Sequence, residues 1–75
     1  MQCKDIPDKL VIRMAKEAGA GGPCVFDALV RLYPVEKVCV AKLERMNDRG
    51  LLECGTGVEW SWPTDAGLEL LNDSA

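Results

Sequence analysis

Histidine is absent from the chain, which excludes the common catalytic pairs in which a histidine activates a serine or a cysteine. The cysteines, Cys3, Cys24, Cys39 and Cys54, lie 21, 15 and 15 residues apart, so CxxC and the other usual zinc-ligand spacings are absent as well. A disulfide or a four-thiolate site is less favoured than reduced, mostly buried thiols. We therefore expect no enzyme activity, no cofactor and no metal.

Long apolar runs are also missing. The longest stretch without a charge is the nine residues Ala18–Phe26, which is too short to cross a membrane. The first five residues have neither the basic start nor the apolar run of a signal peptide. We expect a cytoplasmic protein that does not associate with membranes.

Basic residues are missing from the last third of the chain. Residues 1–50 hold all nine Lys and Arg against seven acids, whereas residues 51–75 hold five acids and no base. Nucleic-acid affinity depends heavily on cations that displace phosphate counterions. The last third is therefore expected to repel a phosphate backbone, while the first two thirds carry a small positive excess.

Apolar residues make up 48% of the 75 residues, which is enough for one dense core and one domain, residues 1–75. Three prolines each precede a segment with helical apolar spacing, and they predict helices at Pro7–Ala18, Pro23–Leu32 and Val35–Arg49. Glycines end the first and third of these helices. A homodimer would cover surplus apolar surface, but no feature of the sequence requires one.

Each predicted helix has an apolar face. The first buries Ile6, Leu10, Val11, Met14 and Ala18, the second Val25, Phe26, Ala28, Leu29 and Leu32, and the third Val35, Cys39, Leu43 and Met46. Basic residues on the opposite face of the first helix, Lys9, Arg13 and Lys16, are interpreted as a solvated stripe, with phosphate contact as the alternative.

The residues after the third helix indicate a hairpin and a closing helix. Leu51–Cys54 is predicted as a strand, followed by a glycine turn and the strand Val58–Trp62. Alternation in the second strand predicts that Trp60 and Trp62 pack over the third helix as core, with a stacking platform for a base or a partner side chain as the alternative. Thr64 is predicted to cap the last helix.

The runs Leu43–Glu53 and Trp62–Gly67 resemble the winged helix-turn-helix superfamily, including MarR- and PadR-like regulators. The matching residues are Leu43, Met46, Arg49-Gly50-Leu51-Leu52, Thr64 and Gly67, and the likeness covers about Pro23–Leu71. It implies a small α+β winged helix with a three-helix helix-turn-helix core, a short β-hairpin wing and a short C-terminal helix. The alternative is a helical bundle with a minor hairpin. The resemblance also implies that the third helix lies in the major groove and that the wing Gly55–Glu59 reaches phosphates.

Two functions remain open from the sequence. The first is a non-enzymatic DNA-binding transcriptional regulator that contacts DNA through Lys37, Ala41, Lys42 and Arg45. The second is an acidic protein-interaction module, either an adaptor or a mobile-element-encoded inhibitor of a host protein, that keeps the winged-helix shell without binding DNA. This second function is suggested by the absence of Lys and Arg from the last third of the chain. Its expected contact face carries Glu53, Glu59 and Glu69.

Overall fold

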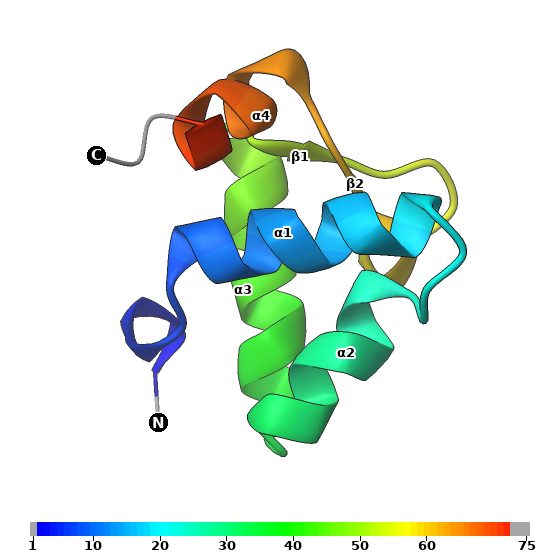
Figure 1. Ribbon diagram of the computed structural model, residues 1–75. Coiled ribbons are helices and arrows are strands. Elements are labelled where there is room, and N and C mark those ends of the chain that lie inside the picture. Colours follow the sequence, from blue (N-terminus) through cyan, green and yellow to red (C-terminus); the bar gives the residue numbers. More distant parts are fainter. Residues whose placement is uncertain (1, 73–75) are drawn as a thin grey trace.

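The computed structural model describes residues 2–72, and within them four α-helices pack together with a two-stranded antiparallel pair at one end (Figure 1). The protein is a small, mostly helical α+β domain, as the sequence predicts. The elements in chain order are η1 (Cys3–Asp5), α1 (Asp8–Gly19), α2 (Val25–Leu32), α3 (Glu36–Asp48), β1 (Leu52–Glu53), η2 (Val58–Trp60), β2 (Trp62–Pro63) and α4 (Asp65–Asn72), where η denotes a short 3-10 helix.

The long helix α3 forms the upright axis of the fold, and α1 crosses it (Figure 1). Helix α2 packs against both α1 and α3, while the strand pair and α4 close the opposite end against α1. The short helix η1 precedes α1 and lies against α3. Both η1 and the strand pair therefore flank α3, and they determine what surrounds its exposed face.

The ends of the helices follow local sequence signals. Pro7 is the extended residue before α1, where its missing amide hydrogen costs no bond. Gly50 follows α3 with a φ of 75°, and the amides of Gly50 and Leu51 donate to the carbonyls of Asn47 and Met46. This pair of bonds is the Schellman arrangement that ends a helix at a glycine. All three predicted helices start and end within two residues of their predicted bounds.

The core is formed by residues from every predicted apolar face. Its buried members are Ile6, Val11, Ile12, Ala15, Val25, Leu29, Cys39, Leu43, Met46 and Leu52. Ile12 and Ala15 are buried although they do not belong to the predicted apolar face, and Leu32 and Val35 are exposed although the prediction places them in the core. Val35 has an extended backbone and precedes α3, so its side chain does not follow the helical periodicity. Leu32 is the last residue of α2.

The predicted strand Val58–Trp62 is wrong. Residues 58–60 form the short helix η2, and only Trp62 and Pro63 pair with β1, in the register Leu52↔Pro63 and Glu53↔Trp62. Pro63, which lies just beyond the predicted strand, is part of the observed one.

The tryptophans are not core residues, contrary to the prediction. Trp60 is 64% exposed and Trp62 is 45% exposed, whereas Ser61 between them is only 3% exposed. The Ser61 hydroxyl donates to the Val58 carbonyl at 2.7 Å and accepts from the Asn47 amide at 3.1 Å. Burying this satisfied hydroxyl against α3 turns Trp62 outward, because successive residues of an extended segment point to opposite sides. Trp60 ends the helix η2 and is exposed there.

Helix α4 is fixed to the strand pair at its first turn. The Gly67 amide donates to the Thr64 hydroxyl at 3.1 Å, so Thr64 caps the helix as predicted. The Leu51 carbonyl lies so close to Gly67 that an added Cβ would come within 2.1 Å of its oxygen. Gly67 is therefore required for the close approach of α4 to the start of the hairpin.

Candidate nucleic-acid interface

The exposed face of α3 carries charges in two neighbouring rows with four-residue spacing. One row is Lys37, Ala41 and Arg45, continued by Arg49 just after the helix, and the other is Glu36, Val40, Glu44 and Asp48. Residues four apart lie one above the other on a helix, so each row is a line along the surface. All the charged members are exposed. Helix α3 thus presents a basic row directly beside an acidic row.

Helix η1 adds a further cation to the basic row. The Cys3 thiol donates to the Val38 carbonyl at 3.8 Å, and Lys4 follows it. A hollow of about 360 Å³ lies between η1 and α3 and is lined by Gln2, Cys3, Lys4, Lys37, Val38, Ala41 and Arg45. Among the residues between Gln2 and Asn72, no carboxylate lines this hollow. We call Lys4, Lys37, Arg45 and Arg49 the basic edge.

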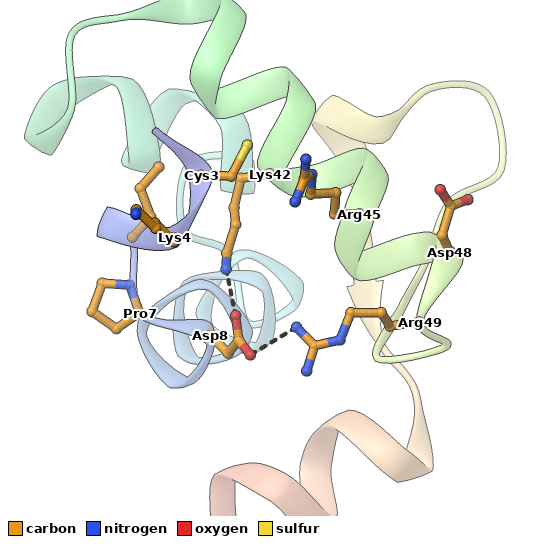
Figure 2. Close-up of a pocket in the computed structure, with 9 residues that line it drawn as sticks. Cys3, Lys4, Pro7, Asp8, Lys42, Arg45, Asp48 and Arg49 are labelled. Atoms are coloured by element: carbon orange, nitrogen blue, oxygen red, sulfur yellow. Dashed lines mark hydrogen bonds and ion pairs between the residues drawn. The ribbon is translucent and has the colours of Figure 1, made fainter. Parts of the chain in front are cut away.

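A second hollow, of about 660 Å³, lies beside the C-terminal half of α3 (Figure 2). Cys3, Lys4 and Arg45 line both hollows. The lining residues of the second are Cys3, Lys4, Ile6, Pro7, Asp8, Lys42, Arg45, Asp48 and Arg49. All four members of the basic edge therefore line one or both of these hollows beside α3.

Lys42, which was predicted to contact DNA, instead forms an ion pair inside the second hollow. It is 6% exposed, and its ammonium donates to Asp8 Oδ1. Arg49 Nη1 donates to the other oxygen, Asp8 Oδ2, at 2.9 Å. In Figure 2 both cations point to this one carboxylate at the start of α1. The prediction of Lys42 as a surface contact is wrong, because α1 covers this side of α3 and supplies its counterion.

The Asp8 carboxylate is held in its charged form. Its partial burial would raise the pKa, but hydrogen bonds and positive charge from Lys42 and Arg49 outweigh burial and lower the pKa below its ordinary value. Asp8 therefore stays ionised and neutralises part of the cationic charge in the second hollow. The first hollow, around Lys4, Lys37 and Arg45, keeps its positive charge.

The four cysteines are free thiols. Burial raises the pKa of the Cys39 thiol, and the nearby Cys3 and Glu36 raise it further, against a lowering by a hydrogen bond with the Val35 backbone. Its sulfur also donates to the Tyr33 carbonyl at 3.1 Å. A protonated, buried thiol is a poor nucleophile. The other three cysteines are half-buried.

The predicted acidic face is spread over three elements. Glu53 is exposed on β1, Glu59 is half-buried in η2, and Glu69 is exposed on α4. Between α3 and the hairpin lies a third hollow, which is lined by Glu44 and Asp48 of the acidic row, by Ala41 and Arg45 of the basic row, and by Asn47, Cys54 and Val58. The acidic row therefore borders the hairpin together with Arg45, while Lys4 and Lys37 lie on the η1 side.

Sequence reasoning missed Lys4, Asp8 and Arg49. The four-residue spacing from Lys37 through Ala41 and Arg45 would have indicated Arg49. Lys4 and Asp8 reach the site only through the packing of η1 and α1 on α3, which no local pattern shows. Of the basic stripe on α1, Arg13 and Lys16 are exposed and Lys9 is half-buried.

No protein-family model matches the chain, and no curated protein or solved structure is significantly similar to it. Within the described part of the chain, no group of three or more Cys, Asp or Glu side chains is placed to hold a metal ion. None of the helices in residues 2–72 combines the length and the apolar character needed to span a bilayer.

Proposed function

We propose that this chain is a small winged-helix DNA-binding transcriptional regulator in which α3 enters the major groove. The observation that supports it is the hollow beside α3, where Lys4, Lys37 and Arg45 gather without a lining carboxylate among the described residues. Cations grouped along one edge of a helix match the spacing of backbone phosphates better than scattered ones.

In this proposal the members of the α3 row have different roles. Arg45 lies in the middle of the basic edge and lines both hollows, so it makes the central contact, to a phosphate or to a guanine edge. Ala41 is small and half-buried, and it allows the helix to approach the groove floor. Lys42 keeps a structural role, because its ammonium is bound by Asp8.

The proposal differs from the usual winged helix in the part assigned to the wing. Residues 51–63, which include the hairpin, hold two carboxylates and no cation. The hairpin also borders the acidic row of α3. DNA would therefore approach from the η1 side of α3, and the hairpin would remain away from the phosphates.

Selection from random double-stranded DNA at low salt, followed by fluorescence anisotropy on the enriched fragment, tests the proposal. Arg45→Ala is expected to weaken binding about tenfold and to reduce the slope of log affinity against log salt by about 1. The matched control is Arg31→Ala, which removes an exposed arginine of α2 that does not line either hollow. Failure to enrich any fragment, or equal weakening by both variants, contradicts DNA binding through α3.

A second candidate, the acidic protein-interaction module, is favoured by the exposure of Trp60 and Trp62 beside acidic residues. It predicts a stoichiometric protein partner and no enriched DNA fragment. Affinity capture from the native host with wild-type protein and with Trp60→Ser distinguishes the two candidates. A partner that is recovered with wild type and lost with the variant, together with failed DNA selection, supports this second function.

A further inference from the structure

Trp60 and Trp62 lie on the side of the hairpin away from the basic edge, and they line a hollow of about 210 Å³. The other lining residues are small or uncharged: Ala15, Ala18, Gly19, Gly22, Cys24, Val25 and Ser61. None of the described residues around it also lines the two hollows beside the basic edge. The hollow has no charged residue in its lining and is bordered by two exposed indoles.

One carboxylate borders Trp62, and a second lies next to Trp60 in the sequence. Glu53 and Trp62 are directly opposite in the strand pair, so their side chains project from the same face of the hairpin. The Trp62 ring also lies over Gly55, where an added Cβ would meet it at 3.7 Å. Glu59 precedes Trp60, and its carboxylate reaches over Gly57. We call Glu53, Glu59, Trp60 and Trp62 the tryptophan surface.

The hairpin side of this surface carries only acidic charges, while α1 on the other side of the hollow carries the exposed Lys16 next to Ala15. Residues 51–75 contain five acids and no Lys or Arg, so no cation of this segment neutralises Glu53 or Glu59. An indole face attracts cations, and a carboxylate beside it adds to the attraction. An anionic ligand, such as a phosphate or an acidic peptide, would be repelled by the same groups.

We propose that the tryptophan surface binds an arginine- or lysine-bearing segment of a partner protein. The aliphatic stem of one basic side chain occupies the small uncharged hollow, and its cationic head lies against an indole and a carboxylate. Lys and Arg bury their stems on apolar surface while their charge remains accessible, so one such side chain satisfies both features. Arginine is preferred, because its planar guanidinium stacks on an indole and pairs with a carboxylate at once.

This inference does not depend on DNA binding by α3. The tryptophan surface and the basic edge are formed by different residues, so one protein could use both. A DNA-binding regulator would then hold a basic partner at its hairpin, while the interaction module of the second candidate would use the tryptophan surface alone. Failure of DNA selection leaves the peptide experiment below fully interpretable.

Capped octa-arginine is the probe, with octa-lysine and octa-glutamate for comparison. Trp60 and Trp62 are the only tryptophans, so intrinsic fluorescence reports on this surface directly. We expect octa-arginine to change the emission and to bind more tightly than octa-lysine, and octa-glutamate to have no effect. Glu53→Gln/Glu59→Gln should weaken octa-arginine binding about tenfold, as expected for loss of two surface ion pairs.

The matched control is Asp65→Asn/Glu69→Gln, which removes the same charge from α4 and is expected to change affinity less than about twofold. Trp60→Ser should also weaken binding. Calorimetry measures this effect, and circular dichroism checks that the variant folds. Equal weakening by the two double variants would show that only net charge attracts the peptide, and would overturn the inference. It is also overturned if single-stranded DNA, rather than the peptide, changes the emission, or if the surface mediates self-association that Trp60→Ser abolishes.

Discussion

The basic edge and the tryptophan surface differ in how the chain builds them. The basic edge is a helical row, in which regular four-residue spacing aligns Lys37, Arg45 and Arg49, and η1 adds Lys4. The tryptophan surface comes from an irregular segment, where a short 3-10 helix and two paired residues turn both indoles outward. The first region depends on periodicity and the second on tertiary packing.

The comparison also explains the uneven charge of the sequence. The cations of the basic edge come from the first 50 residues, and the acids of the tryptophan surface come from the last 25. Folding places them around different hollows, because no described residue lines both the hollow at Trp60 and Trp62 and the two hollows beside the basic edge. A phosphate backbone and a basic peptide are therefore attracted to different sides, and each is repelled from the other's side.

The largest expected effect comes from removing the support of the basic edge. Asp8→Ala leaves Lys42 nearly buried without its counterion, and we expect a loss of about 3 kcal/mol in unfolding free energy. Urea denaturation followed by circular dichroism measures it. The control is Asp48→Ala, which removes an exposed acid from the same hollow and should change stability by less than about 0.5 kcal/mol. Similar losses for both variants would show that the ion pair does not hold α1 on α3.

The second-largest expected effect is a loss of stability from a substitution on the hairpin side of the molecule. In Gly67→Ala the new methyl group meets the Leu51 carbonyl, so α4 must move away from the start of the hairpin. We expect a net loss of about 1–2 kcal/mol, because overpacking outweighs the better helix propensity of alanine. Gly19→Ala is the control: nothing lies within 4 Å of its added Cβ, and this variant should be neutral or slightly more stable. A stable Gly67→Ala protein with unchanged tryptophan emission would contradict the close packing of α4.

The sequence was sufficient for the helices but not for the hairpin. Proline before a helix and glycine after it are local signals, and they located α1, α2 and α3 to within two residues. The hairpin has only two paired residues per strand, so local pattern does not determine its register. A change of one residue exchanges the buried and exposed sides. Here the bond between Asn47 and Ser61, 14 residues apart, accompanies burial of the serine and exposure of the indoles.

The candidate site was predictable where it depends on the helical pattern of α3, and it was not predictable where it depends on contacts between distant segments. Periodicity correctly indicated that Lys37 and Arg45 are exposed on α3. It could not show that Lys42 is bound by Asp8, because these two residues are 34 positions apart and meet only when α1 packs on α3. The same packing brings in Lys4. Pairings between distant segments are the part of the site that a single sequence does not contain.

A smaller expected effect is a change in DNA affinity on substituting the acidic row of α3. Glu44 lies in the acidic row beside Lys37 and Arg45, so it opposes phosphate binding in the proposed complex. Glu44→Gln is expected to raise affinity for the selected DNA about twofold to fivefold, as for removal of one exposed repulsion. Glu69→Gln on α4 makes the same charge change away from α3 and should leave affinity unchanged. If both variants raise affinity equally, DNA affinity depends on the net charge of the protein and not on the charged rows of α3.

The pH dependence of the Asp8 cluster tests the same ion pair in a second way. Because the pKa of Asp8 is lowered in the folded state, its contribution to stability is fully present above its unfolded pKa and is lost as the pH falls through the folded value. Unfolding free energies of wild type and Asp8→Asn should therefore differ at pH 6 and converge progressively below about pH 4. Asp27→Asn, an exposed acid on α2, serves as the control and should follow wild type throughout. A constant gap between wild type and Asp8→Asn down to pH 2 would mean that Asp8 is not held ionised by Lys42 and Arg49.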